Sequence, residues 1–143
     1  MNRKNKILVT VVAVLLAVSF TYLFFEHFVI YSVEELGMHI KVVEGRLIGV
    51  NTDADAIYFG SVGHGGISTR KIILDNYDER PHFVQIRTFG EISEWVFVSD
   101  NNFVIEPNGS KNVSVSCEVP MDVEARNYTG TLQAVYFNIW DWV

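Results

Sequence analysis

Cysteine and basic residues are scarce in this sequence, and each scarcity excludes a class of protein. One cysteine, Cys117, stands among 143 residues, so the chain cannot form an intramolecular disulfide bond. Small secreted domains usually depend on several disulfides. Here a hydrophobic core must supply the stability instead.

Positive charge is concentrated at the N-terminus. Arg3, Lys4 and Lys6 are three of 11 basic residues, and the rest of the chain has 8 basic against 17 acidic residues, a formal charge of −9. Such an acidic surface repels nucleic acid, which we exclude as a partner. A protein, a glycan or a cation is the expected partner.

Between Lys6 and Lys41 no Lys or Arg occurs, and residues 7–25 form an uncharged apolar run. A helix of these nineteen residues is roughly 28 Å long, about the thickness of the hydrocarbon core of a bilayer. The run therefore predicts a single-pass transmembrane helix that contacts the lipid bilayer. Because basic residues stay in the cytoplasm, we expect a cytoplasmic tail over 1–6 and an extracytoplasmic C-terminal part in the cell membrane.

A cleaved signal peptide is the alternative interpretation of the same run. Residues 17–19, Ala-Val-Ser, resemble the small-residue pattern that signal peptidase recognises. The apolar stretch nevertheless continues through bulky residues to Phe25, which favours retention of the helix as an anchor. Whether the helix is cleaved stays open.

A partly apolar helical face continues beyond the run through Phe28, Tyr31 and Leu36, and Gly37 is a plausible helix stop. We therefore predict a helical juxtamembrane stalk over 26–37. An interfacial or helix-pairing segment is the alternative.

From residue 38 the hydrophobic period changes to two, which predicts one β-rich domain over 38–143. Short segments rich in β-branched and aromatic residues alternate with turn formers, and no helical pattern separates them. This pattern is typical of an all-β antiparallel sandwich or barrel. The expected strands are 38–43, 46–50, 56–60, 69–75, 82–88, 94–98, 103–105, 112–119 and 130–137.

The segment 112–119 has the clearest alternation. Val113, Val115 and Cys117 should face the core, so Cys117 acts as a small buried hydrophobic residue. The preceding residues 106–109, Glu-Pro-Asn-Gly, predict a tight turn with Asn108 exposed at its tip.

The order of these motifs resembles immunoglobulin-like sandwiches of the major sperm protein and ASH type, which also occur in prokaryotic membrane-anchored surface proteins. The resemblance covers 57–137 and rests on turn and core motifs, so it implies a fold but transfers no functional residue. Domains of this kind bind other proteins or act as spacers, which is analogy at the level of fold. The residues that carry the resemblance are Tyr58-Phe59-Gly60, the strand that ends at Asn76, the turn Pro107-Asn108-Gly109, Val119-Pro120 and Tyr128-Thr129-Gly130.

No residue pattern indicates catalysis or a cofactor. The four histidines lack metal-ligand spacing and are expected on the surface, and no nucleophile motif accompanies any Ser, His and carboxylate set. We therefore expect a protein that is not an enzyme and holds no cofactor. Asn51, Asp53 and Asp55 form a weak candidate Ca²⁺ site, but the pattern lacks the glycine and distal glutamate of an EF-hand.

Two further sets of residues are candidate sites. The apolar C-terminus is a candidate partner-binding segment, because exposed tryptophans are costly in water unless they fold back on the domain or meet the membrane. N-x-Ser/Thr sequons are candidate glycosylation sites. The first set comprises Ile139, Trp140 and Trp142, and the second comprises Asn108, Asn112 and Asn127.

Together these features favour a membrane-anchored interaction or structural subunit of the cell envelope, such as a surface layer, pilus or secretion assembly. Its expected partner is an envelope or appendage protein, and a homo-oligomer is possible. The alternative is an extracytoplasmic binding module for a glycan or Ca²⁺, in which Asn51, Asp53, Asp55 and exposed aromatics such as Tyr58 form the site.

Overall fold

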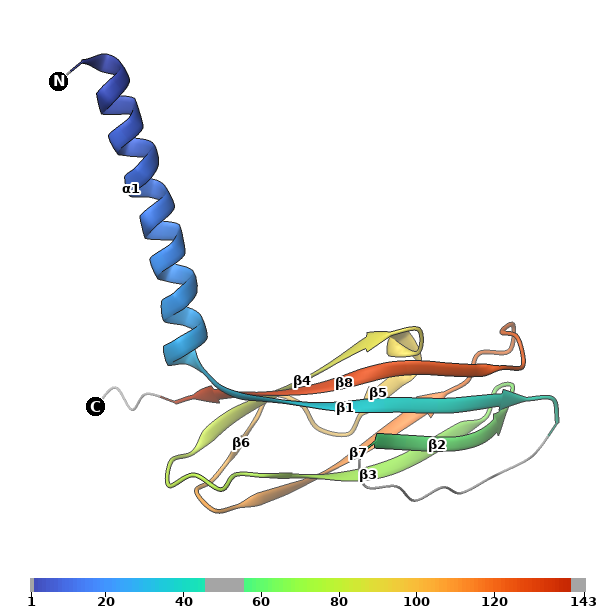
Figure 1. Ribbon diagram of the computed structural model, residues 1–143. Coiled ribbons are helices and arrows are strands. Elements are labelled where there is room, and N and C mark those ends of the chain that lie inside the picture. Colours follow the sequence, from blue (N-terminus) through green and yellow to red (C-terminus); the bar gives the residue numbers. More distant parts are fainter. Residues whose placement is uncertain (1, 46–55, 140–143) are drawn as a thin grey trace.

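The computed structural model describes residues 2–45 and 56–139 and shows one long helix followed by a β-rich domain (Figure 1). Helix α1 (Arg3–Phe24) continues into a single π-helical turn, η1 (Phe25–Val29). A short 3₁₀ turn, η2 (Ser93–Trp95), precedes the fifth strand. The strands are β1 (Ile30–Val43), β2 (Ala56–Gly63), β3 (Ile67–Asp75), β4 (His82–Gly90), β5 (Val96–Val98), β6 (Phe103–Ile105), β7 (Ser110–Glu118) and β8 (Asn127–Asn138). The predicted strand at 46–50 lies outside the described residues.

The strands form two sheets, which confirms the predicted sandwich. Sheet A has the strand order β2-β1-β8-β4-β6, and sheet B has the order β3-β7-β5. In Figure 1, β4, β8 and β1 of sheet A run along the upper part of the sandwich, and β7 and β3 of sheet B run along its lower part. The prediction of a purely antiparallel sandwich is wrong, because β1 and β2 pair in parallel. The twelve residues between these strands meet the length that a parallel connection requires, about a dozen.

The core lies between the sheets and follows the predicted alternation. On β7, Val113, Val115 and Cys117 are fully buried, and they face Leu132 and Tyr136 of β8, which come from the other sheet. The predicted burial of Cys117 is thereby confirmed. Burial raises the pKa of its thiol to about 12.

The predicted helical stalk over 26–37 is wrong beyond its first turn. Strand β1 begins at Ile30 and pairs with β8 from Ile30, opposite Phe137, to Lys41, opposite Asn127. An apolar helical period was present locally, but the backbone of a strand gains a continuous hydrogen-bonded ladder with a distant segment. That long-range pairing decides the conformation.

Helix α1 stands apart from the core of the described part of the domain. None of its residues is buried, and it is long and apolar enough to cross a membrane. In Figure 1 the helix rises steeply from the end of the sandwich at which β1 begins and β8 ends. We call this the helix-proximal end.

Candidate functional site

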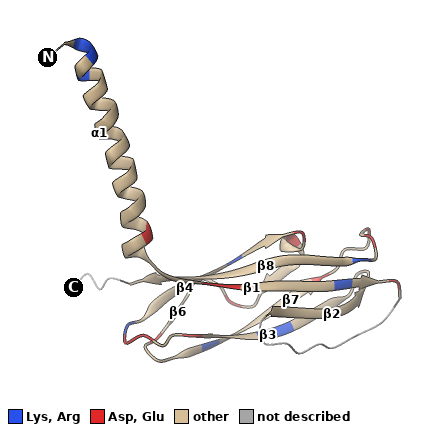
Figure 2. Cartoon of the chain, in the orientation of Figure 1, with Lys and Arg blue, Asp and Glu red and all other residues tan. Residues whose placement is uncertain are grey.

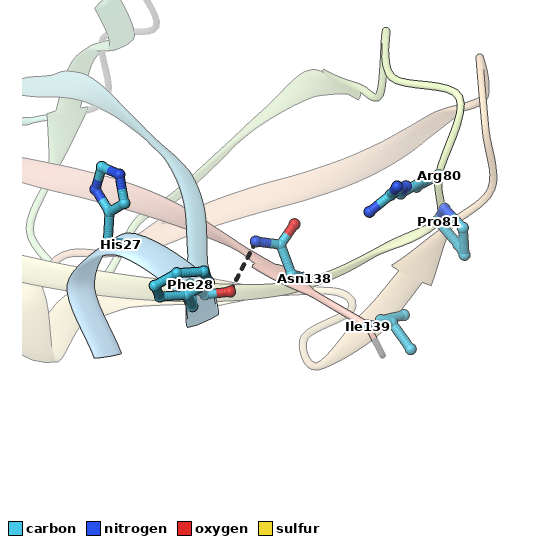
Figure 3. Close-up of a pocket in the computed structure, with 6 residues that line it drawn as sticks. All are labelled: His27, Phe28, Arg80, Pro81, Asn138 and Ile139. Atoms are coloured by element: carbon cyan, nitrogen blue, oxygen red, sulfur yellow. Dashed lines mark hydrogen bonds between the residues drawn. The ribbon is translucent and has the colours of Figure 1, made fainter. Parts of the chain in front are cut away.

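A small pocket lies at the helix-proximal end, where η1, the start of β4 and the end of β8 meet. It encloses about 110 Å³. Figure 3 shows its lining residues. We call it the neck pocket, and it is lined by His27, Phe28, Arg80, Pro81, Asn138 and Ile139.

A hydrogen bond closes one side of the neck pocket. Asn138 Nδ2 donates to the carbonyl oxygen of Phe28 at 3.0 Å (Figure 3). This bond satisfies a carbonyl at the end of the helix, where backbone acceptors lack intrahelical partners. It also joins the helical segment to the last residue of β8. The pocket therefore depends on a contact between residues 110 positions apart.

The opposite side of the pocket is held by a buried asparagine. Asn76 Nδ2 donates to the carbonyl oxygen of Arg80 at 2.7 Å, and its Oδ1 accepts from the backbone N–H of Asp78 at 3.0 Å. These bonds fix the turn that presents Arg80 and Pro81. A buried amide that satisfies several backbone groups makes the conformation of a turn specific.

A buried histidine lies beside this turn. His82 is fully buried, its Nε2 donates to Asp78 Oδ2 at 2.9 Å, and its ring stacks on Tyr31 with centroids 4.0 Å apart. The hydrogen bond from His82 holds the pKa of Asp78 below its ordinary value. Because no solvent reaches the ring, His82 is placed to organise the turn and not to exchange protons with a substrate.

Tyrosine and carboxylate pairs occupy the same end of the sandwich. Tyr136 donates to Glu34 at 3.3 Å, and Tyr77 donates to Asp75 at 3.0 Å. Burial and then the charge of Glu34 raise the pKa of Tyr136, whereas the hydrogen bond to Asp75 chiefly raises that of Tyr77. Both hydroxyls therefore stay protonated, and both carboxylates accept hydrogen bonds.

Comparison with known proteins finds no matching family model, no matching curated protein and no matching solved structure. The geometry of the molecule is thus the basis for any functional proposal.

The structure places some of the predicted site residues and does not describe others. Ile139 is half-buried and lines the neck pocket. The three sequon asparagines are exposed, and Asn108 stands at its predicted turn with a φ of 52°. The predicted residues outside the described ranges are Trp140 and Trp142 of the C-terminal segment, and Asn51, Asp53 and Asp55 of the weak Ca²⁺ site.

The histidines are dispersed, as the sequence predicts, but not all lie on the surface. His39 stacks on Tyr58 with centroids 5.0 Å apart, and His64 Nε2 lies 2.7 Å from the carbonyl oxygen of Val123. His82 is buried, so the expectation of surface histidines is wrong at that position. Within residues 2–45 and 56–139, no three His, Cys, Asp or Glu side chains are grouped to hold a metal ion.

A second, more open hollow of about 280 Å³ lies at the far end of the sandwich, around Trp95, Phe97 and Met121. Met121 contacts the loop glycine Gly65, whose φ of 69° is readily adopted only without a side chain. Of the residues that line the two hollows, Ile139 was a candidate site residue from the sequence.

Proposed function

We propose that the chain is a membrane-anchored, non-catalytic interaction or structural subunit of the cell envelope, whose domain contacts a partner at the neck pocket. The observation that carries the proposal is that α1 buries none of its residues within residues 2–45 and 56–139. A helix that is apolar all round requires an apolar medium or a partner around it.

The composition of α1 and η1 makes a bilayer a favourable medium. Residues 7–25 include thirteen Leu, Ile, Val and Phe side chains. At about 0.3–0.6 kcal/mol each, their insertion near the bilayer centre contributes roughly 4–8 kcal/mol. Figure 2 shows Lys and Arg at the N-terminal end of α1 and an acidic residue at its other end, which supports a cytoplasmic N-terminus.

The residues that line the neck pocket favour the binding of a partner over catalysis. Its lining combines an aromatic, an aliphatic and a proline side chain with one guanidinium and one amide. The nearby His82 is fully buried, and its Nε2 donates to Asp78. Aromatic and arginine side chains in a recess are typical anchors of protein contacts.

We further propose that the domain is immunoglobulin-like. Two features support this assignment: the strands form two sheets, and the chain passes from one sheet to the other at every connection from β2 to β8. The parallel β1–β2 pair departs from a purely antiparallel version of that fold.

The proposal is tested by site-specific photo-crosslinking of the full chain in intact cells. A photoreactive amino acid replaces Ile139 in the neck pocket, and the control replaces Met121 at the far end, which is 76% exposed. We expect a single envelope protein to be captured from position 139 and not from position 121, with reciprocal capture from that partner. Only self-crosslinks, or turnover of a substrate that is lost on changing one polar residue, would contradict the proposal.

A further inference from the structure

The outer face of sheet A carries an apolar patch close to the helix. Cross-strand register places Phe83 opposite both Phe137 and Val104, and Val33 opposite Val135. Residues directly opposite each other point to the same side of a sheet, and these alternate with the core residues of β1, β4 and β8. We call Val33, Phe83, Val104, Val135 and Phe137 the A-face patch.

The A-face patch is contiguous, and its most exposed residues are Val33 and Val104 at its two edges. The rings of Phe83 and Phe137 lie 6.1 Å apart, and Val135 is only 4% exposed although it faces away from sheet B. Val33 and Val104 remain 44% and 46% exposed. An apolar patch of this kind indicates a contact with something outside the described protein.

The outer face of sheet B differs in its pattern of side chains. Its exposed apolar residues each lie opposite a polar one: Ile67 opposite Glu118, Ile73 opposite Asn112 and Phe97 opposite Ser116. Thr69 also bonds to Ser116 at 2.8 Å. Polar neighbours separate the apolar side chains there, and the face carries the exposed sequon Asn112, as expected of a surface in water.

The charges on sheet A also differ from those of the domain as a whole. Among its described outward-facing residues, Lys41 and Arg87 are basic and only Glu35 is acidic. The part of the chain after the N-terminal tail is strongly acidic. The strands of this face therefore carry a small excess of positive charge, which favours an approach to lipid phosphates.

The position of α1 relative to sheet A indicates what the A-face patch contacts. In Figure 1 the helix rises on the side of the molecule along which β4 and β8 of sheet A run, and it stands steeply to the strands. The bond from Asn138 to Phe28 ties the base of the helix to the end of β8 within this sheet. A bilayer crossed by α1 therefore extends over the side of the sandwich along which β4 and β8 of sheet A run.

We propose that the outer face of sheet A lies on the headgroup region of the bilayer that α1 crosses, so that the strands run along the membrane. The inference rests on the anchoring that is part of the proposed function. It adds the bilayer surface as a second binding partner and leaves sheet B and its sequon facing away from the lipid.

The test compares matched positions on the two faces of the full chain. Val33→Cys, Phe89→Cys and Val104→Cys place a label on sheet A, and Ile73→Cys and Phe97→Cys place it on sheet B. All five native side chains are apolar and between 44% and 62% exposed. The parent chain is the labelling control, because its Cys117 is buried and its thiol pKa is raised.

Each variant is labelled with a fluorescent NBD group and reconstituted at low density into phosphatidylcholine vesicles with a minor fraction of phosphatidylglycerol. We expect lipids with a nitroxide near the headgroup to quench the three sheet A labels and to leave the two sheet B labels bright. Equal quenching on both faces, or none on sheet A, would overturn the inference.

Two further readouts separate the remaining outcomes. Labels on sheet A that are protected from aqueous iodide, yet untouched by nitroxide lipid, would show that a second copy or the C-terminal residues cover the patch, and this also overturns the inference. Flotation of the vesicles is scored in parallel. If the chain does not float with them, the anchoring in the proposed function fails, whereas flotation without quenching removes only the membrane contact of sheet A.

Discussion

Replacement of Asn76 should destabilise the domain far more than replacement of any exposed asparagine. Asn76 is 3% exposed, and its Nδ2 lies within 3.2 Å of three carbonyl oxygens, those of Arg80, Ile105 and Glu106. Its Oδ1 accepts from the backbone N–H of Asp78. The side chain thereby joins the turn before β4 to the turn after β6.

The magnitude follows from the number of bonds. An amide has two N–H groups, so three acceptors share two bonds, and the accepted bond brings the total to three. At about 1 kcal/mol for each hydrogen bond, Asn76→Ala should cost about 3 kcal/mol of unfolding free energy. Loosening of the turn that carries Arg80 and Pro81 should accompany this loss.

The assay is denaturant unfolding of the full chain in detergent, followed by tryptophan fluorescence. The matched control is Asn112→Ala on β7, which is exposed and should change the free energy by less than about 0.5 kcal/mol. A cost for Asn76→Ala below about 1 kcal/mol, or equal to that of the control, would refute the reasoning.

The variant Asn76→Asp tests the same hydrogen bonds through the pH dependence of its stability. An ionised carboxylate cannot donate to the carbonyl oxygens of Arg80, Ile105 and Glu106, so the folded protein favours the protonated acid and raises its pKa. A raised folded pKa means that stability is retained below the unfolded pKa, about 3.9, and lost as pH rises through the folded value. The variant should therefore approach the wild type only in acid.

Three other predictions concern the buried thiol of Cys117, the stability of the protein in acid and the close contact between β4 and β8 at Gly130. Cys117 should resist thiol reagents at mildly alkaline pH until the protein unfolds, because burial raises its pKa to about 12; mass spectrometry after brief labelling checks this, and rapid reaction of the folded chain would contradict it. The hydrogen bond from His82 lowers the pKa of Asp78 in the folded protein. Asp78 therefore stabilises the fold above its unfolded pKa, and this stabilisation is lost as pH falls through the folded pKa. Thermal melting in the acid range should show a weaker pH dependence of stability for Asp78→Asn. Gly130→Ala should cost about 1–3 kcal/mol because its Cβ would lie 2.8 Å from the Phe89 carbonyl oxygen. Gly37→Ala, whose Cβ would meet only side chains at 3.3 Å or more, is the control for that melt and should be much less affected.

Local patterns predicted much of the domain. The alternation over 112–119 identified a strand whose core residues are all buried, because the two-residue period depends only on the strand's own sequence. The turn at 106–109 was predicted from Pro and Gly, and Gly109 N–H donates to the Glu106 carbonyl oxygen at 3.0 Å. The apolar run at 7–25 likewise needed no tertiary information.

Of the residues that line the neck pocket, only Ile139 was predicted from the sequence as a site residue. The contacts that build the neck pocket join Phe28 to Asn138 and Asn76 to Arg80, and the first pair is separated by most of the chain. Nothing in the neighbourhood of His82 marked it as buried, because its cover comes from Tyr31 on another strand. Such pairings leave no periodic signal in the sequence.

The sequence by itself determined the apolar helix, the strand positions and the inward-facing residues, because these follow from local periodicity and turn chemistry. Only the tertiary structure decided that residues 30–37 are a strand, that β1 and β2 run parallel, and that Phe83 of β4 lies opposite both Phe137 of β8 and Val104 of β6. The physical reason is that hydrogen bonds and burial between paired strands outweigh the local conformational preference of each segment. The partner of a strand is distant in the sequence, so local patterns do not identify it.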